Sequence, residues 1–162
     1  MKITFIQTGG TIDKDYPRTS KGYAFEISEP AVKRILEKLN PAFDFEIISA
    51  IKKDSMEMTD DDRQKIYDIC KELNNDKIII THGTDTMMET AEKLSSIKDK
   101  VIVITGAMRP ERFTNSDAPI NIGVAIGAAN VLETGVYIAM HGQVLPWNGI
   151  TRNMDTGQFV ME

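Results

Sequence analysis

The chain has 162 residues, of which 41% are hydrophobic and 27% are charged, a composition typical of a globular protein with one domain. Its net charge is −5 and its lysines and arginines are scattered, which argues against a nucleic-acid-binding surface. No apolar run approaches the roughly 20 residues of a membrane span, and the first residues lead into a strand pattern rather than a signal peptide. We therefore expect a cytoplasmic protein with a single domain over residues 1–162.

Five apolar runs rich in Ile and Val predict the strands of a sheet. They lack the strict alternation of a half-exposed strand, so both of their faces are expected to be buried. The runs are residues 2–7, 45–51, 77–81, 101–105 and 135–140.

Four helical patterns separate these strands. Ser28 is predicted to cap the first helix, with Pro30 in its first turn, and Thr59 is predicted to cap the second. Alternation of strands and helices indicates an α/β fold with three layers, a doubly wound, mostly parallel sheet in a single Rossmann-like domain. The helical patterns cover residues 28–40, 59–73, 84–94 and 116–133.

Apolar residues at helical spacing define one side of each later helix. The single cysteine, Cys70, falls on such a stripe and is interpreted as a buried core thiol. The stripes are Ile66, Ile69, Cys70 and Leu73 in the second helix, Met87, Ala91 and Leu94 in the third, and Ile120, Val124, Gly127 and Val131 in the fourth.

Two segments are not typical of compact connections. Residues 9–27 are polar and of mixed charge, and a loop of this length in a small domain is often a functional lid. Residues 143–162 are predicted to be irregular, with Trp147 covering an apolar edge.

Threonine and glycine follow two of the predicted strands, in "TGGTID" at 8–13 and "THGTDTM" at 81–87. The carboxyl ends of parallel strands are where α/β folds bind ligands. Two glycines allow a close approach to the backbone before Thr11, while Thr84 and Asp85 precede a helix whose N–H groups favour an anion. A hydroxyl facing such donors suits acyl transfer, and Asp85 can anchor an amine, so the pattern favours a small zwitterion with a side-chain carbonyl.

These motifs do not match two common nucleotide-binding patterns, and each also has a simpler structural interpretation. "TGGT" is not the G-x-G-x-x-G of a dinucleotide site, and no G-K-[ST] of a P-loop occurs. Thr84 could simply cap the following helix, because threonine is a favoured N-cap. His82 and His141 are distant and lack carboxylates at ligand spacing, so no metal or cofactor is expected.

Five ordered motifs together resemble the bacterial-type L-asparaginases, which are threonine amidohydrolases. Besides the two stretches above, they are "DSMEMT" at 54–59, "VIVITGAMRP" at 101–110 and "SDAPINIG" at 116–123. The resemblance runs from residue 2 to about residue 155, where larger members continue into a smaller C-terminal domain. It implies a short, single-domain member with an asparaginase N-terminal-type domain.

This resemblance implies a role for each matching residue. Thr11 matches the nucleophile that forms an acyl-enzyme and releases ammonia, Thr84 matches the second threonine, and Asp85 matches the acid that holds the α-ammonium. Ser55 matches the serine that holds the α-carboxylate. The positions expected to bind substrate are Gly10, Tyr23 of the lid, Asp54, Ser55, Gly83 and Ala107.

The match to the family changes at the catalytic lysine, whose place is taken by Arg152. Arginine stays protonated and cannot act as a base, so Lys14 and His82 become the candidates, although His82 could equally be packed at its strand end. Met56 replaces a polar residue that often helps to bind the amine, and the C-terminal domain that completes the amine site is not expected.

The sequence thus predicts an L-asparagine amidohydrolase that needs no cofactor and assembles as a homodimer or larger homo-oligomer. Two alternatives remain: a non-catalytic module that binds asparagine or aspartate, which Arg152 favours, and an amidase for another small amide such as glutamine.

Overall fold

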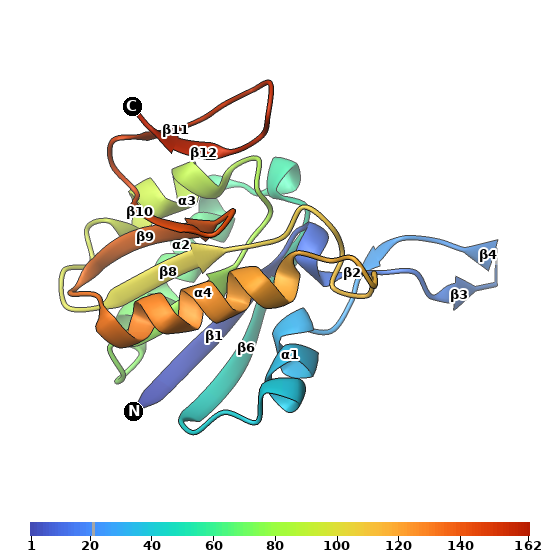
Figure 1. Cartoon of the computed structure of the whole chain (residues 1–162), viewed down its shortest axis with the longest axis horizontal. Coiled ribbons are helices and arrows are strands. Elements are labelled where there is room, and N and C mark those ends of the chain that lie inside the picture. Colours follow the sequence, from blue (N-terminus) through green and yellow to red (C-terminus); the bar gives the residue numbers. More distant parts are fainter. Residues whose placement is uncertain (21) are drawn as a thin grey trace.

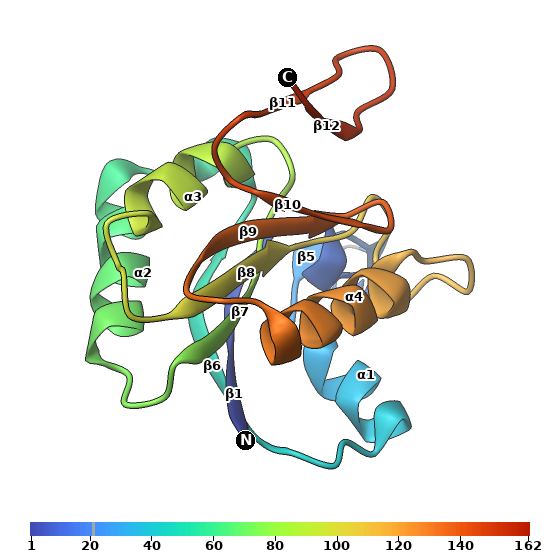
Figure 2. The same ribbon diagram turned by 60° about the vertical axis from the view of Figure 1, so that its left-hand side comes forward.

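The computed structural model describes residues 1–20 and 22–162, apart from the side chains of Arg18, Thr19 and Tyr23. At its centre lies a six-stranded sheet with the order β10-β9-β8-β7-β1-β6 (Figures 1 and 2). All neighbours are parallel except β10, which pairs antiparallel with β9. The strands are β1 (Lys2–Gly9), β6 (Asp44–Lys53), β7 (Lys77–Thr81), β8 (Val101–Thr105), β9 (Gly135–Met140) and β10 (Gln143–Pro146).

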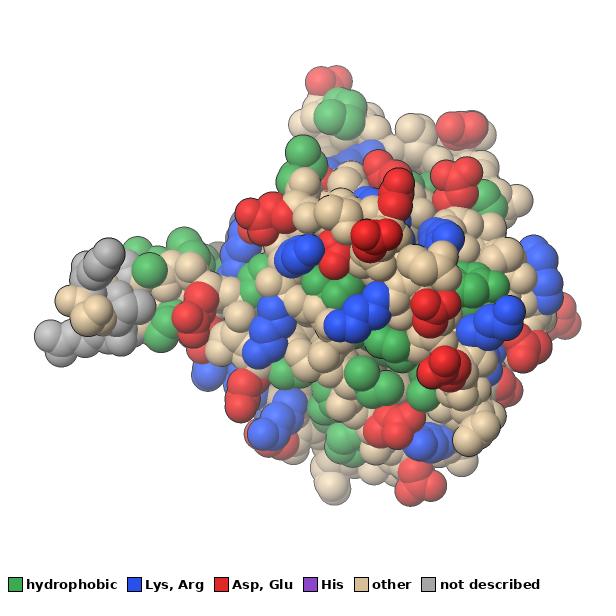
Figure 3. All heavy atoms as spheres, turned by 180° about the vertical axis from the view of Figure 1, so that it is seen from behind, with side chains coloured by type: hydrophobic (Ala, Val, Ile, Leu, Met, Phe, Trp, Pro, Cys, Tyr) green, Lys and Arg blue, Asp and Glu red, His purple; other side chains and the backbone are tan. Residues whose placement is uncertain are grey.

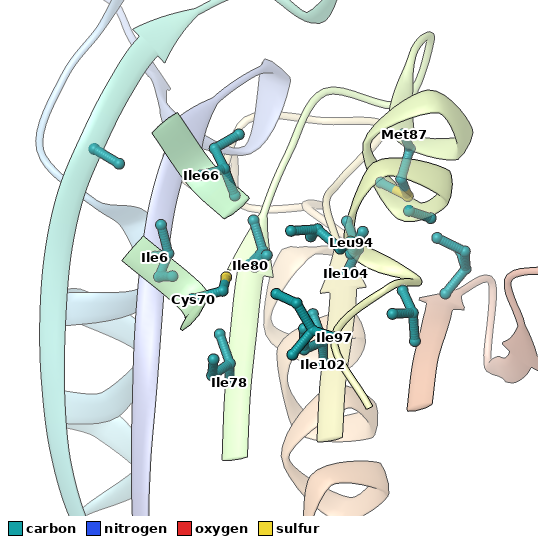
Figure 4. Close-up of a cluster of buried hydrophobic side chains, with 14 of the residues drawn as sticks. Ile6, Ile66, Cys70, Ile78, Ile80, Met87, Leu94, Ile97, Ile102 and Ile104 are labelled. Atoms are coloured by element: carbon teal, nitrogen blue, oxygen red, sulfur yellow. The ribbon is translucent and has the colours of Figure 1, made fainter. Parts of the chain in front are cut away.

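Helices cover both faces of this sheet, which confirms the three-layer, doubly wound prediction (Figure 2). One face is covered by α1 (Ala31–Leu39) and α4 (Ala118–Val131), and the other by α2 (Asp60–Glu72) and α3 (Met87–Leu94). A hydrophobic core lies between the sheet and each pair of helices. Figure 4 shows the core on the side of α2 and α3, in which Ile66 and Cys70 of α2 contact isoleucines of the strands. Each fully buried aliphatic side chain contributes about 1.5–3 kcal/mol to stability, so these cores hold the strand ends in place.

The β8–α4–β9 connection has the opposite handedness to the β1–α1–β6, β6–α2–β7 and β7–α3–β8 connections. From β6 the chain steps to β7, β8 and β9 in one direction along the sheet, yet α2 and α3 pack on one face and α4 on the opposite face. Connections between parallel strands are right-handed in about 98% of cases. Because the first three connections share one hand, the fourth is the left-handed exception.

The start of α1 differs from its prediction. Pro30, not Ser28, stands at the N-cap position, and its side chain cannot make a capping hydrogen bond. The N–H of Ala31 donates instead to the carboxylate of Asp13, at 2.8 Å. The predicted cap of α2 is confirmed, because Thr59 accepts from the N–H of Asp62, whose side chain accepts from Thr59 in return.

The packing side predicted for α4 is wrong. Ile120 is 66% exposed and Val131 is 80% exposed, so these two residues of the predicted stripe face away from the sheet, while Val124 packs partly against the core. The fully buried side carries Ala118, Ile122, Ala125 and Ala129. Small residues let the helix approach the strands closely, and a helix that is apolar all round gives no periodic signal of which side will be buried.

Two segments contain short strands that the sequence pattern did not predict. Residues after β1 form an arm that projects from the body (Figure 1), built from β2 (Lys14–Asp15) paired with β5 (Glu26–Ile27) and β3 (Arg18–Thr19) paired with β4 (Gly22–Tyr23). Tyr23, which is predicted to belong to a lid, lies on this arm, and its side chain is outside the described part of the structure. Near the C-terminus, β11 (Ile150–Arg152) pairs with β12 (Phe159–Met161).

Charges on the surface are mixed in sign. On the face shown in Figure 3, acidic and basic side chains are interspersed over the body of the molecule. In the part of the chain that the structure describes, no helix has the length and apolar character needed to cross a membrane.

Candidate active site

The loops that follow four adjacent strands bring most of the predicted site residues to one edge of the sheet. They follow β1 at Gly10, β6 at Asp54, β7 at His82 and β8 at Gly106. The chain leaves β1 toward α1 on one face and leaves β7 toward α3 on the other, so β1 and β7 flank a topological switch point. Such a point is where open α/β sheets form their ligand crevice.

Glycines allow these loops to touch. A Cβ atom on Gly10 would lie 2.4 Å from the Cα of Gly83, and one on Gly83 would lie 2.6 Å from the Oγ of Ser55. Gly10 also has a φ of 81°, which other residues rarely adopt. The absent side chain at Gly10 therefore makes room for the neighbouring loop, and its part in substrate binding stays a prediction.

Thr11 begins a 3-10 turn, η1 (Thr11–Asp13), directly after β1. The turn is fixed on one side by the N–H of Gly10, which donates to the carbonyl of Lys53 at 3.0 Å. Thr11 and Thr84 are both half-buried, and the hydroxyl of neither has a hydrogen-bond partner among the described residues. Both hydroxyls are therefore available to a bound molecule.

Asp85 joins two other segments at this edge. The Oγ of Ser55 accepts from the N–H of Asp85 at 3.3 Å, and the hydroxyl of Thr86 donates to the carbonyl of Ser55 at 2.8 Å. The Nη1 of Arg152 lies 2.7 Å from the Oδ1 of Asp85. Ser55, Asp85 and Arg152 are thus brought together, although Arg152 comes from the distant β11–β12 hairpin.

The interpretation of Thr84 as a helix cap is wrong. α3 begins at Met87, and Thr86 occupies its N-cap position without a side-chain capping bond. Thr84 lies two residues before this N-cap position, so its hydroxyl does not cap the start of α3. Met56, which the resemblance predicts to stand in place of a polar residue, is 73% exposed.

His82 is a packing residue rather than a base. Its ring is completely buried, with Nδ1 2.7 Å from the carbonyl of Gly83 and Nε2 2.8 Å from the hydroxyl of Thr90. Burial lowers the pKa of His82 to about 4. Lys14, the other candidate base, forms a salt bridge of 2.9 Å with Asp54.

Ala107 lies in a loop that is held by residues the sequence did not single out. The N–H groups of Met108 and Arg109 donate to the carboxylate of Asp117 at 3.0–3.1 Å. Asn121 donates to the carbonyl of Gly106 at 3.0 Å. Aspartate before a helix is a common motif, so "SDAPIN" carried a signal for Asp117, but nothing in the sequence linked it to the loop before it.

A metal-ligand set is not found within residues 1–20 and 22–162, where no group of three or more His, Cys, Asp or Glu side chains could hold an ion. Whether the chain needs a metal or cofactor stays a prediction.

Comparison with known proteins places the chain in a family. The family described as "Asparaginase, N-terminal" matches residues 2–159. The chain is 28% identical to the glutaminase-asparaginase of Acinetobacter glutaminasificans, over 99% of this chain and 53% of that protein. It is 31% identical to the probable periplasmic L-asparaginase of Haemophilus influenzae, over 95% of this chain and 47% of that protein.

A solved structure shows the same fold. The thermostable L-asparaginase from Thermococcus kodakarensis superposes with a TM-score of 0.83 at 26% identity, covering 99% of this chain and 51% of that chain. The chain spans about half the length of the relatives that it matches. Because the family match covers residues 2–159, which is nearly the whole chain, the chain belongs to the asparaginase family and corresponds to its N-terminal domain.

Proposed function

We propose that this chain carries an amidohydrolase site for L-asparagine, with Thr11 as the nucleophile. The observation that supports this most is the convergence of a free Thr11 hydroxyl, a free Thr84 hydroxyl and the Ser55–Asp85–Arg152 contacts at one sheet edge. Membership of the asparaginase family also supports an amidohydrolase site.

In the proposed reaction, the Oγ of Thr11 attacks the side-chain amide carbon of the substrate. The C–N bond breaks, and ammonia leaves with the proton that Thr11 gave up. Water then attacks the Thr11 ester, and its C–O bond breaks to release aspartate and restore the hydroxyl. Ser55 is proposed to bind the α-carboxylate, and the second oxygen of Asp85, which Arg152 does not occupy, to bind the α-ammonium.

The oxyanion needs N–H donors that are not already bonded within the protein. Candidates in these loops include the backbone N–H groups of Thr11, Gly83, Thr84 and Ala107, which have no hydrogen-bond partner among the described residues. Those already bonded are the N–H groups of Gly10, Asp85, Met108 and Arg109.

Glutamine is the second candidate substrate. One relative is named a glutaminase-asparaginase, and its similarity covers nearly the whole of this chain. A binding module without turnover is the remaining alternative, because Arg152 cannot accept a proton. Cytoplasmic location and homo-oligomeric assembly stay predictions.

A panel of amides with ammonia detection tests the proposal. Wild type is expected to release ammonia from asparagine faster than from glutamine, and Thr11→Ala is expected to lose at least about a thousandfold in kcat. Thr11→Ser, which keeps a hydroxyl, should retain measurable turnover.

The same panel separates the alternatives. Thr11→Ala with more than about a tenth of wild-type rate would exclude Thr11 as the nucleophile and make Thr84 the next candidate. Calorimetric binding of asparagine with no ammonia release in wild type would instead identify a binding module.

A further inference from the structure

Asp13 is a buried acid that the proposed reaction does not use. Its side chain is completely buried, at the end of the 3-10 turn that begins with Thr11. One carboxylate oxygen accepts from the N–H of Ala31, while Oδ2 has no partner among the described residues. An unpaired buried carboxylate oxygen costs stability, so its presence beside the proposed nucleophile needs a reason.

The hydrogen bonds of Asp13 join three separate stretches of chain. Its N–H donates to the carbonyl of Gly10 at 3.2 Å, which closes the turn that contains Thr11. Its carbonyl accepts from the N–H of Ser28 at 3.0 Å, where the arm returns to the body. Its side chain accepts from Ala31 at 2.8 Å, at the first turn of α1. One residue therefore links the turn, the base of the arm and the helix.

A local cap would not provide this link. Ser28 lies close enough in sequence to cap α1, but the helix has no capping hydrogen bond from a neighbouring side chain. An acid that lies before the whole arm in the sequence takes that place. A negative charge also suits the positive end of the α1 dipole.

Neighbouring groups hold the same junction. Gln7 donates to the carbonyl of Ser28 at 2.9 Å, and the N–H of Glu111 donates to the carbonyl of Ile12 at 3.2 Å. The carboxylate of Glu111 pairs with Arg34 of α1 at 2.6 Å. The turn is thus held both by α1 and by the loop that contains Glu111. Within the described residues, Asp13 provides the only side chain of the turn that forms a hydrogen bond with α1.

We propose that Asp13 is a positioning residue for Thr11, holding the turn that carries the nucleophile against the base of the arm and the start of α1. This inference rests on the proposed function for its effect on turnover, but the mechanical link does not depend on it. Asp13 does not touch the substrate. It acts by fixing the backbone from Gly10 to Lys14.

Two substitutions at Asp13 and one control test this. Asp13→Ala removes the acceptor for the Ala31 N–H, whereas Asp13→Asn keeps an acceptor oxygen in the same place. Thr4→Val is the matched control, because it removes the partly buried hydrogen bonds that the buried Thr4 hydroxyl makes to Glu46 and Asn75 at the opposite end of β1. All are assayed at a temperature at which near-ultraviolet circular dichroism shows them fully folded.

Asp13→Ala is expected to lose at least about tenfold in kcat for asparagine, with KM changed by less than about threefold. Asp13→Asn and Thr4→Val should stay within about threefold of wild type in both constants. Wild-type kcat in Asp13→Ala, or equal losses in the Ala and Asn variants, would overturn the proposal. If Asp13→Ala does not fold, Asp13→Ser replaces it, since its shorter side chain stays polar but does not reach Ala31.

Amide hydrogen exchange tests the link without any reaction. The amides of residues 10–14 and 28–32 should exchange at least about tenfold faster in Asp13→Ala than in Thr4→Val. Uniform acceleration over the whole chain, or none, would overturn the proposal even if wild type hydrolyses asparagine. Local acceleration in Asp13→Ala, found together with a wild type that releases no ammonia, would instead contradict only the proposed function.

Discussion

Asp13 and His82 are buried titratable residues whose pKa values move in opposite directions. Burial raises the pKa of Asp13 from 3.8 to about 6, partly offset by its hydrogen bond from Ala31. Burial lowers the pKa of His82 from 6.5 to about 4. Burial therefore disfavours the charged form of both side chains in the folded state.

These pKa changes affect stability with opposite signs. For Asp13 the unfolded chain ionises first, so stability is lost as the pH rises from 3.8 to about 6. For His82 the unfolded chain takes up the proton first, so stability is lost as the pH falls from 6.5 to about 4. Each effect amounts to about 3 kcal/mol, so the two largely cancel between these limits.

Asp13→Asn should remove this balance. We expect the variant to be more stable than wild type at pH 7, by up to about 3 kcal/mol, because no charge is buried. Its stability should then fall steeply below pH 6.5, as only the His82 effect remains. Urea unfolding between pH 4 and pH 8 measures both. A variant less stable than wild type at pH 7 would contradict this, and His82→Gln should show the reverse slope.

At the scale of elements, the close contact between the loops after β6 and β7 predicts the effect of small substitutions. A Cβ on Gly83 would meet the Oγ of Ser55 at 2.6 Å and force the loop of Asp85 away from the loop of Ser55. We expect Gly83→Ala to lower kcat/KM by at least about tenfold and to destabilise the fold.

Gly127→Ala is the matched control for this substitution. Gly127 lies inside α4 with nothing within 4 Å of an added Cβ. The control should therefore gain up to about 1 kcal/mol in stability by helix propensity, with unchanged kinetics. Thermal melts and ammonia release test the pair, and equal behaviour of the two variants would contradict the close contact.

The β11–β12 hairpin contacts the site through Arg152. The ion pair with Asp85 joins a side chain that is 22% exposed to one that is 51% exposed, so it contributes only about 0–1 kcal/mol to stability. We expect Arg152→Ala to change the melting temperature little but to lower kcat/KM, because Asp85 loses the cation that orients it.

Arg152→Lys is expected to be more active than Arg152→Ala, since a lysine can release its proton. The pH dependence of kcat gives the decisive measurement. Superimposable profiles and equal rates in wild type and Arg152→Ala would show that Arg152 takes no part in the chemistry.

For the whole molecule, the sheet and its helices were predictable because long apolar runs and helical spacing mark them directly. Strands of two or three residues in the arm and near the C-terminus carry no such period. The contact between Asp85 and Arg152 was suggested only by resemblance. The role of Asp13 could not be predicted, because its partner Ala31 lies beyond the arm and no periodic pattern relates the two.

The left-handed connection through α4 changes how the loops diverge at the edge that holds the site. After β6, β1, β7 and β8, which are neighbours in that order, the chain departs toward α2, α1, α3 and α4, and so toward alternate faces. A right-handed connection would have sent the chain after β8 to the same face as the chain after β7. Instead the loop of residues 82–86 has a diverging neighbour on each flank. A small molecule lying on that loop is therefore open to Thr11 from one flank and to the backbone around Ala107 from the other.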